Sequence, residues 1–110
     1  MARILVAGGC GFIGSHLVDR LLARRDVVDL CIVDNLWTGL QQNIAHIDDR
    51  RLQFVQADVE TFRSTSVFDE IYHLASPASP PWYMAEPLRT ISANVVGTLS
   101  LVGMLAPGGQ

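Results

Sequence analysis

Three glycines and one aspartate carry the clearest chemical signal in the sequence. Gly9, Gly11 and Gly14 lie directly after the apolar run Arg3–Ala7 and open a stretch with helical spacing. Glycines in such a turn let the backbone approach an anion closely, and a helix N-terminus offers that anion unpaired N–H groups. Asp34 follows Gly14 by twenty residues, at the end of the next apolar run, where a carboxylate can accept hydrogen bonds from a ribose. This pattern predicts a dinucleotide-binding site.

Asp34 also indicates which dinucleotide is bound. A 2′-phosphate at this position would meet the like charge of the carboxylate, and Asn35-Leu36-Trp37 offers no arginine to neutralise it. The sequence therefore favours NAD over NADP. The alternative interpretation is a glycine-rich turn and a solvated aspartate that bind no ligand.

The elements expected around this motif alternate between strands and helices. Four short runs are apolar or alternate in polarity, which predicts strands at residues 3–7, 27–33, 52–56 and 68–75. Apolar residues at helical spacing predict helices at residues 12–24 and 87–105, with a shorter helix within 41–47 and one or two helical turns within 58–67. This order predicts an α/β fold, a partial Rossmann-type doubly wound parallel sheet of about four strands in the order 3-2-1-4, with helices on both faces.

Four strands are fewer than the about six of a complete doubly wound dinucleotide fold. In the order 3-2-1-4, the fourth strand forms an open edge where a fifth strand would pair. We therefore expect residues 1–110 to be the N-terminal part of an NAD-binding Rossmann domain, with the catalytic segment and the substrate domain lying outside it.

The composition excludes several functional classes. The chain carries a net charge of −3, which argues against binding to nucleic acid, and no apolar run approaches the ~20 residues of a membrane span. Cys10 and Cys31 are too few for a disulfide framework or a zinc site, so we expect a cytoplasmic protein without a metal centre. All eight basic residues are arginines, which excludes chemistry that needs a lysine from this chain.

The glycine loop can also be read with the spacing Gly8-x-x-Gly11-x-x-Gly14. In this reading the chain resembles the extended short-chain dehydrogenase/reductase family, the NAD-dependent epimerases and dehydratases that modify nucleotide sugars. The stretches 33–39, 58–59 and 94–99 are similar to the same family. The segment Ile71–Pro81 looks most like one branch, the UDP-glucuronate decarboxylases, so the resemblance extends over nearly the whole chain.

The resemblance implies contacts to each part of NAD and to the substrate. The pyrophosphate would be contacted through the backbone by Gly11, Phe12 and Ile13, and Gly8 and Gly14 would complete this cofactor-binding loop. The adenosine ribose would be held by Asp34 and Asn35, with Thr38 and Gly39 closing over the phosphate side, and the adenine would be flanked by Asp58 and Val59. The dinucleotide crevice would be lined by Leu74, Ala75 and Ser76, and the sugar-nucleotide side by Pro77 to Pro81 and Tyr83.

The family's catalytic pair is not found in this sequence. Family members oxidise a sugar hydroxyl with NAD and use a Tyr-x-x-x-Lys pair; in the decarboxylase branch the resulting keto acid loses CO₂ and NADH reduces the product again. Tyr72 is followed by Ser76 at the lysine position, and Tyr83 by Pro87. Ser92 stands where the branch usually carries a substrate-binding lysine, and residues 104–110 depart from the family pattern.

These departures lead us to expect no catalytic residue in this chain, and no activity from the 110 residues alone. The resemblance implies a UDP-glucuronate substrate and a homodimeric assembly for the family's enzymes. Two alternatives are another nucleotide-sugar 4,6-dehydratase or 4-epimerase of the same family, and a non-catalytic NAD-binding module.

Overall fold

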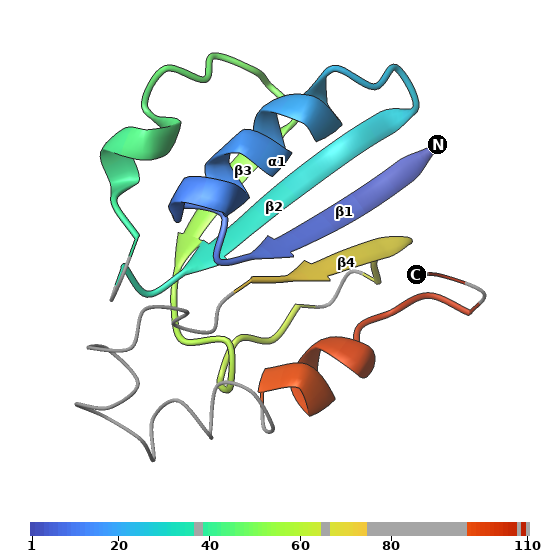
Figure 1. Cartoon of the computed structure of the whole chain (residues 1–110). Helices are drawn as coiled ribbons and strands as arrows, with labels where there is room; N and C mark the ends of the chain where they lie inside the picture. The colour runs from blue at the N-terminus through green and yellow to red at the C-terminus, as the bar shows by residue number, and fades with distance from the viewer. Residues whose placement is uncertain (37–38, 65–66, 75–96, 108, 110) are drawn as a thin grey trace.

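The computed structural model describes residues 1–36, 39–64, 67–74, 97–107 and 109. At its centre lies one parallel sheet (Figure 1). The sheet order is β3-β2-β1-β4, and all neighbouring strands are parallel. The strands are β1 (Ala2–Ala7), β2 (Val27–Asp34), β3 (Leu52–Gln56) and β4 (Glu70–His73). The α-helix α1 (Phe12–Leu22) joins β1 to β2, and a 3₁₀ helix, η1 (Gln41–Ile44), precedes β3. The α/β fold and the strand order predicted from the sequence are confirmed.

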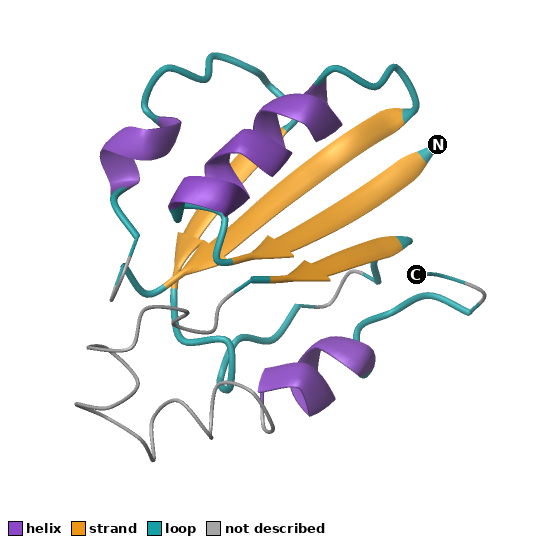
Figure 2. Cartoon of the chain, in the orientation of Figure 1, coloured by secondary structure: helices purple, strands orange, loops and turns teal. Residues whose placement is uncertain are grey.

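The alternation of side chains along β1 and β2 builds two apolar layers. Ile4 and Val6 face α1, whereas Leu5 and Ala7 face the opposite side of the sheet. Figure 2 shows α1 and η1 on one side and the helical residues 97–102 on the other. The first layer also contains Val18 and Leu21 of α1, and the second contains Leu101 and Met104. Both faces are therefore buried along Ile4–Ala7 of β1 and Leu30–Val33 of β2, which explains the continuous apolar runs there.

Several predicted elements differ at their ends. The fourth strand begins at Glu70 rather than at residue 68, because Phe68 instead makes an isolated bridge with Leu105. The first helix ends at Leu22 rather than at residue 24, because Ala23 and Arg24 donate to carbonyls three residues back and tighten the last turn.

The connecting segments also contain less helix than predicted. The helix expected within 41–47 is a 3₁₀ turn over Gln41–Ile44, and the helical turns expected within 58–67 reduce to hydrogen-bonded turns that start at Asp58. In the predicted helix 87–105, the helical conformation ends at residue 102, and residues 87–96 lie outside the described residues. Within the described ranges, no helix combines the length and apolar character needed to cross a bilayer.

The sheet brings the predicted site residues to one edge. Ala7 pairs with Val33 of β2 and with His73 of β4, so three strands end at the same level. Asp34 at the end of β2 pairs with Gln56 of β3. The arrowheads in Figure 1 point to this edge, where α1 begins. Open α/β sheets bind ligands outside the carboxyl ends of their strands, so this edge is the candidate site.

Candidate functional site

The glycine loop forms a tight turn between β1 and α1. Gly8 has a φ of 88°, in the left-handed region that glycine adopts without strain. Its N–H donates to Val33 O at 2.7 Å, which fixes the start of the loop to β2. The Gly11 N–H then donates back to Gly8 O at 3.2 Å, and the first helical hydrogen bond runs from Ser15 N to Gly11 O at 2.9 Å. Backbone hydrogen bonds thus fix both ends of the loop, at Gly8 and at Gly11.

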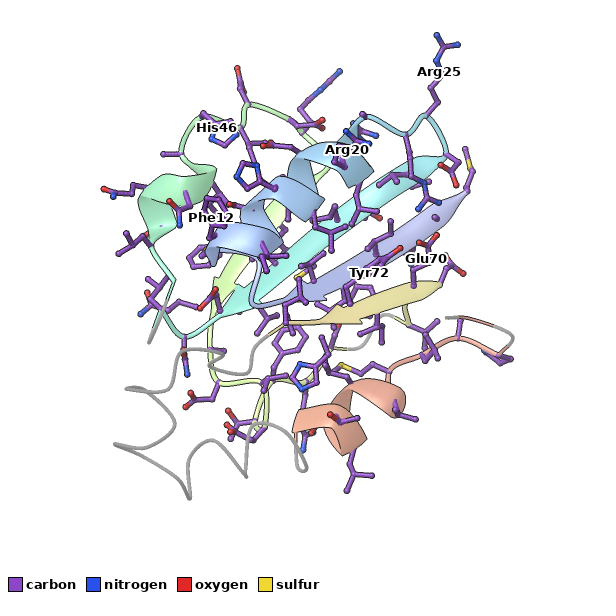
Figure 3. The ribbon with its side chains drawn as sticks, in the orientation of Figure 1. Phe12, Arg20, Arg25, His46, Glu70 and Tyr72 are labelled. Carbon is purple, nitrogen blue, oxygen red and sulfur yellow. The ribbon has the colours of Figure 1, made fainter. Side chains whose placement is uncertain are left out.

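The first turn of α1 leaves hydrogen-bond donors open. No described residue accepts a hydrogen bond from the N–H groups of Phe12, Ile13 or Gly14. The first turn also contains no acidic side chain that would neutralise the positive end of the helix dipole. Phe12 is 78% exposed, and its ring meets the His16 ring edge-on at 4.8 Å (Figure 3). Three amide donors and a partial positive charge therefore remain for an anion.

Glycine stands at the three loop positions for different steric reasons. A Cβ on Gly14 would lie 2.2 Å from Gly8 O, and a Cβ on Gly9 would lie 2.6 Å from the Ile32 side chain. A Cβ on Gly11 would meet only Gly8 O, at an ordinary 3.4 Å. Packing of the chain therefore requires Gly9 and Gly14 but not Gly11. The open space in front of Gly11 fits the close approach of a pyrophosphate, so the loop satisfies the demands of the predicted cofactor.

Asp34 is turned toward the glycine loop and is only 7% exposed. Its Oδ2 accepts a hydrogen bond from the Cys10 N–H at 3.0 Å, and its Oδ1 accepts one from the Leu36 N–H at 2.8 Å. Leu36 has a φ of 63°, unusual for a residue with a Cβ, at this tight turn after β2. A carboxylate can accept about four hydrogen bonds, so capacity remains for ribose hydroxyls. The predicted ribose contact of Asp34 stays a prediction, and its contact with Cys10 was missed.

The segment after Asp34 covers the glycine loop. A Cβ on Gly39 would lie 2.9 Å from Asp34 Oδ2 and 2.9 Å from the Cys10 carbonyl carbon. Leu40 N and Asn43 Nδ2 both donate to Cys10 O, at 3.0 and 2.8 Å. Gly39 was predicted to close over the phosphates, and the structure brings it against the loop. Asn43 was missed, because the sequence shows only an amide within a polar stretch.

Asn35 and Asp58 connect the ends of β2 and β3. Asn35 Nδ2 donates to Asp58 Oδ1 at 2.7 Å, which joins a predicted ribose residue to a predicted adenine residue. The Val59 side chain is only 5% exposed, and a Cβ on Gly97 would lie 2.6 Å from its Cγ1. The predicted adenine contact of Val59 would therefore involve its backbone, because its side chain belongs to the core.

The structure describes the first of the predicted crevice residues. The Leu74 N–H donates to Ala7 O at 2.7 Å, directly before Gly8, and Leu74 is 39% exposed. Leu74 thus lies beside the glycine loop at the candidate edge. The remaining predicted contacts lie outside the described residues. They are Thr38 at the phosphates, Ala75 and Ser76 in the crevice, and Pro77 to Pro81 and Tyr83 on the sugar-nucleotide side.

A charged cluster surrounds the beginning of β4. Both Glu70 carboxylate oxygens accept hydrogen bonds from Arg24, at 2.9 and 2.8 Å, and Tyr72 OH donates to Glu70 Oε1 at 2.8 Å (Figure 3). The Arg24 contact lowers the pKa of Glu70, and the bond to Glu70 together with burial raises the pKa of Tyr72. A raised pKa is the opposite of what a phenolic general base requires. This cluster therefore ties α1 to β4 rather than serving catalysis.

A cavity of about 810 Å³ lies on the sheet face that does not carry α1. Its lining includes Cys31 of β2, Val55 of β3 and Phe62, with Arg50 and Arg63 among its polar residues. None of the glycine-loop residues contributes to this lining. The open amide donors of α1 and the Asp34 carboxylate lie instead at the carboxyl edge of the sheet.

The loop geometry agrees with the comparison to protein families. A sequence model of the NAD dependent epimerase/dehydratase family matches residues 4–109. The chain belongs to this family. The resemblance inferred from the glycine loop is therefore confirmed, and the family to which the chain belongs is NAD-dependent.

Relatives with assigned names point to one branch of the epimerase/dehydratase family. The chain is 48% identical over 103 residues to UDP-glucuronic acid decarboxylase 2 of Arabidopsis thaliana, and 45% identical over 103 residues to UDP-glucuronic acid decarboxylase 1 of Danio rerio. These alignments cover 93% of this chain but 22% and 24% of the two relatives. The chain thus spans about a quarter of the length of the relatives it matches.

Two solved structures share the fold of this chain. DesIV of Streptomyces venezuelae, a dTDP-glucose 4,6-dehydratase with NAD and TYD bound, aligns with a TM-score of 0.81 at 34% identity. WbmF of Bordetella bronchiseptica, in complex with NAD+ and UDP, aligns with a TM-score of 0.76 at 28% identity. The alignments cover 93% and 94% of this chain and 35% and 31% of the two structures.

Proposed function

We propose that this chain is the NAD-binding portion of a UDP-glucuronate decarboxylase, an enzyme that converts UDP-glucuronate to UDP-xylose and CO₂. The observation that carries the proposal is the 48% identity to a named decarboxylase over 103 residues. The glycine loop supports it independently, because it offers open amide donors beside Asp34 at the carboxyl edge of the sheet.

The proposal assigns a separate task to each group of described residues. The open N–H groups of Phe12, Ile13 and Gly14 would hold the pyrophosphate of NAD, with Gly11 leaving room for its approach, and Asp34 would accept hydrogen bonds from the adenosine ribose. Bound NAD would supply the hydride chemistry. In a chain of the relatives' length, the group that moves the proton of the sugar hydroxyl would come from outside these 110 residues.

Cofactor binding is the first part of the proposal to test. The 110-residue chain is titrated with NAD and, in parallel, with NADP, and binding is followed by calorimetry or by the amide resonances in NMR spectra. We expect NAD to bind more tightly than NADP, because the 2′-phosphate would lie against the Asp34 carboxylate. Equal affinity for the two dinucleotides, or no binding of either, would contradict the cofactor assignment.

A chimera tests the reaction. The matching 103 residues of the Arabidopsis decarboxylase are replaced by those of this chain, and the purified chimera is incubated with UDP-glucuronate. We expect UDP-xylose and CO₂, with the same chimera carrying Asp34→Ala as the inactive control. Absence of UDP-xylose from a folded chimera that binds NAD would refute the assignment to the decarboxylase branch.

A sister activity of the same family is the second candidate. It is favoured by the alignment of this chain with the dTDP-glucose 4,6-dehydratase, which has a TM-score of 0.81 and a sequence identity of 34%. An epimerised or dehydrated sugar among the chimera's products would favour this candidate. A chain that binds NAD but gives a chimera without turnover would favour a non-catalytic NAD-binding module.

A cytoplasmic location and a homodimeric assembly also belong to the proposal. The location is supported by Cys10 and Cys31, which are buried and not bridged to one another, as in a reducing compartment. Fractionation of the source cells tests the location. Sedimentation of the chimera tests the assembly.

A further inference from the structure

The Cys10 carbonyl lies in the middle of the glycine loop and accepts two hydrogen bonds from one segment. The Leu40 N–H donates to it at 3.0 Å, and Asn43 Nδ2 donates at 2.8 Å. The N–H of Cys10 is held as well, because it donates to Asp34 Oδ2 at 3.0 Å. The peptide groups on both sides of Cys10 are therefore fixed by residues outside the loop.

The peptide group held by Asn43 also contains the Gly11 amide. Because a peptide group is planar, a rotation that moves the Cys10 carbonyl must also move the Gly11 N–H. The Gly11 N–H donates to Gly8 O at 3.2 Å and closes the turn before α1, whose first N–H groups, at Phe12 and Ile13, find no acceptor among the described residues. The hydrogen bonds to the Cys10 carbonyl therefore help to fix the turn from which the open donors of α1 project.

Asn43 is itself rigidly supported. Its N–H donates at 2.9 Å to the carbonyl of Leu40, the residue before η1, and the neighbouring Ile44 is buried against the α1 side of the sheet. Farther along, His46 Nε2 lies 3.0 Å from Asp19 Oδ1 of α1 (Figure 3). A turn packed on α1 therefore carries the side chain that holds the loop at the start of α1.

We propose that Asn43 is a positioning residue for NAD, which acts by holding the Cys10 carbonyl so that the loop amides keep their direction toward the pyrophosphate. The inference rests on the proposed cofactor function. One neutral hydrogen bond in a partly buried place changes an equilibrium constant by about three- to tenfold. Loss of the Asn43 amide is therefore expected to weaken NAD binding by about the same factor.

The test compares Asn43→Asp and Asn43→Ala with the matched control Gln42→Glu in the 110-residue chain. Gln42 is the exposed neighbour on η1, so Gln42→Glu introduces the same charge without touching Cys10. NAD and adenosine are titrated separately while the amide resonances are followed by NMR. Adenosine lacks the pyrophosphate, so its binding reports the fold of the site without the loop contacts.

Both Asn43 variants are expected to bind NAD about three- to tenfold more weakly, to bind adenosine as the wild type does, and to remain folded. The Gly11 amide proton is expected to move upfield in the free variants, because the Cys10 carbonyl loses a donor. Gln42→Glu is expected to match the wild type in all measurements.

Unchanged NAD affinity in both Asn43 variants would overturn the proposal. Equal losses for NAD and adenosine, or an unfolded Asn43→Ala chain, would also overturn it, because Asn43 would then serve general stability. A wild-type chain whose resonances do not respond to NAD would instead refute the proposed function. In that case the Gly11 shift in the free variants still decides whether Asn43 holds the loop.

Discussion

Replacing Gly11 with alanine is expected to weaken NAD binding without destabilising the fold, whereas the same change at Gly14 is expected to destabilise the fold itself. Gly11 has a φ of −74° and a ψ of 171°, which any residue adopts. A Cβ there would meet only Gly8 O at 3.4 Å. A Cβ on Gly14 would lie 2.2 Å from the same oxygen and 3.0 Å from Gly9 Cα.

These distances determine the expected magnitudes. Gly14→Ala requires the backbone to move by about 1.2 Å to restore the 3.4 Å contact seen at Gly11, and overpacking of this kind costs about 1–3 kcal/mol. In a domain of about 100 residues, each kcal/mol lowers Tm by about 4–8 °C. Gly11→Ala instead gains about 0.4–1 kcal/mol, because alanine restricts the unfolded chain.

The effects on NAD affinity follow from the same geometry. The methyl group of Gly11→Ala would occupy the open space in front of the loop, where the pyrophosphate is proposed to approach. We expect NAD to bind at least about tenfold more weakly, which corresponds to about 1.4 kcal/mol.

Thermal melting and calorimetric titration with NAD are carried out on the wild type and on both variants. A Gly11→Ala chain that keeps its Tm but binds NAD as the wild type does would refute the steric argument for the cofactor. A Gly14→Ala chain that melts with the wild type would refute the assigned packing of the loop.

Three further changes test other parts of the chain. Asp34→Asn is expected to weaken NAD binding by about tenfold and to lower Tm, because an amide nitrogen placed at Oδ2 cannot accept from the Cys10 N–H; calorimetry and melting report both effects. Burial raises the pKa of Cys10 to about 12 and that of Cys31 to about 11, so iodoacetamide at about pH 8 is expected to leave the folded chain unmodified in mass spectra. Hydrogen bonds from Arg51 lower the pKa of Asp49 from 3.8 to about 2. The ionised Asp49 therefore stabilises the fold fully above pH 3.8, and this stabilisation is lost as the pH falls toward 2. The variant Asp49→Asn is expected to remove this part of the acid dependence of Tm.

Each of these changes has a matched control. Alkylation of both thiols in guanidinium chloride shows that the reagent is active, and fast modification of the folded chain would contradict the assigned burial. Asp48→Asn is the control for Asp49, because Asp48 is its exposed neighbour; equal acid responses of the two variants would contradict the role of Arg51. An Asp34→Asn chain with wild-type NAD affinity would contradict the assignment of Asp34 to the site.

The strands and the glycine loop could be predicted because their signals are local. The third strand, Leu52–Gln56, has the predicted bounds, and β2 extends the predicted strand 27–33 only by Asp34. Alternation and apolar runs report burial on the faces of a sheet directly. Gly8 and Gly14 could be assigned from their spacing, because the tight turn before a helix gives Gly8 a φ of 88° and leaves no room for a Cβ on Gly14.

The ends of elements and the contacts between segments could not be predicted from local patterns. The fourth strand begins two residues later than predicted, because Phe68 makes a bridge with Leu105, a residue far along the chain. The hydrogen bond from Asn43 to Cys10 spans 33 positions, and Arg24 reaches Glu70 across 46. Such partners become neighbours only after the sheet has formed, so no spacing in the sequence reports them.

The contacts of Asp34 change how mutations at this site should be interpreted. Asp34 was predicted as a ribose ligand, yet its carboxylate also holds the Cys10 N–H within the glycine loop. A loss of NAD binding in an Asp34 variant therefore combines the loss of a ligand contact with a displaced loop. Gly11 makes no comparable packing contact, so a loss of binding in Gly11→Ala reports the cofactor alone. The family's signature at this edge thus contains residues that shape the loop, such as Asp34, and one residue, Gly11, that leaves room for the ligand. Among these, only Gly11→Ala tests cofactor binding without also changing the fold of the loop.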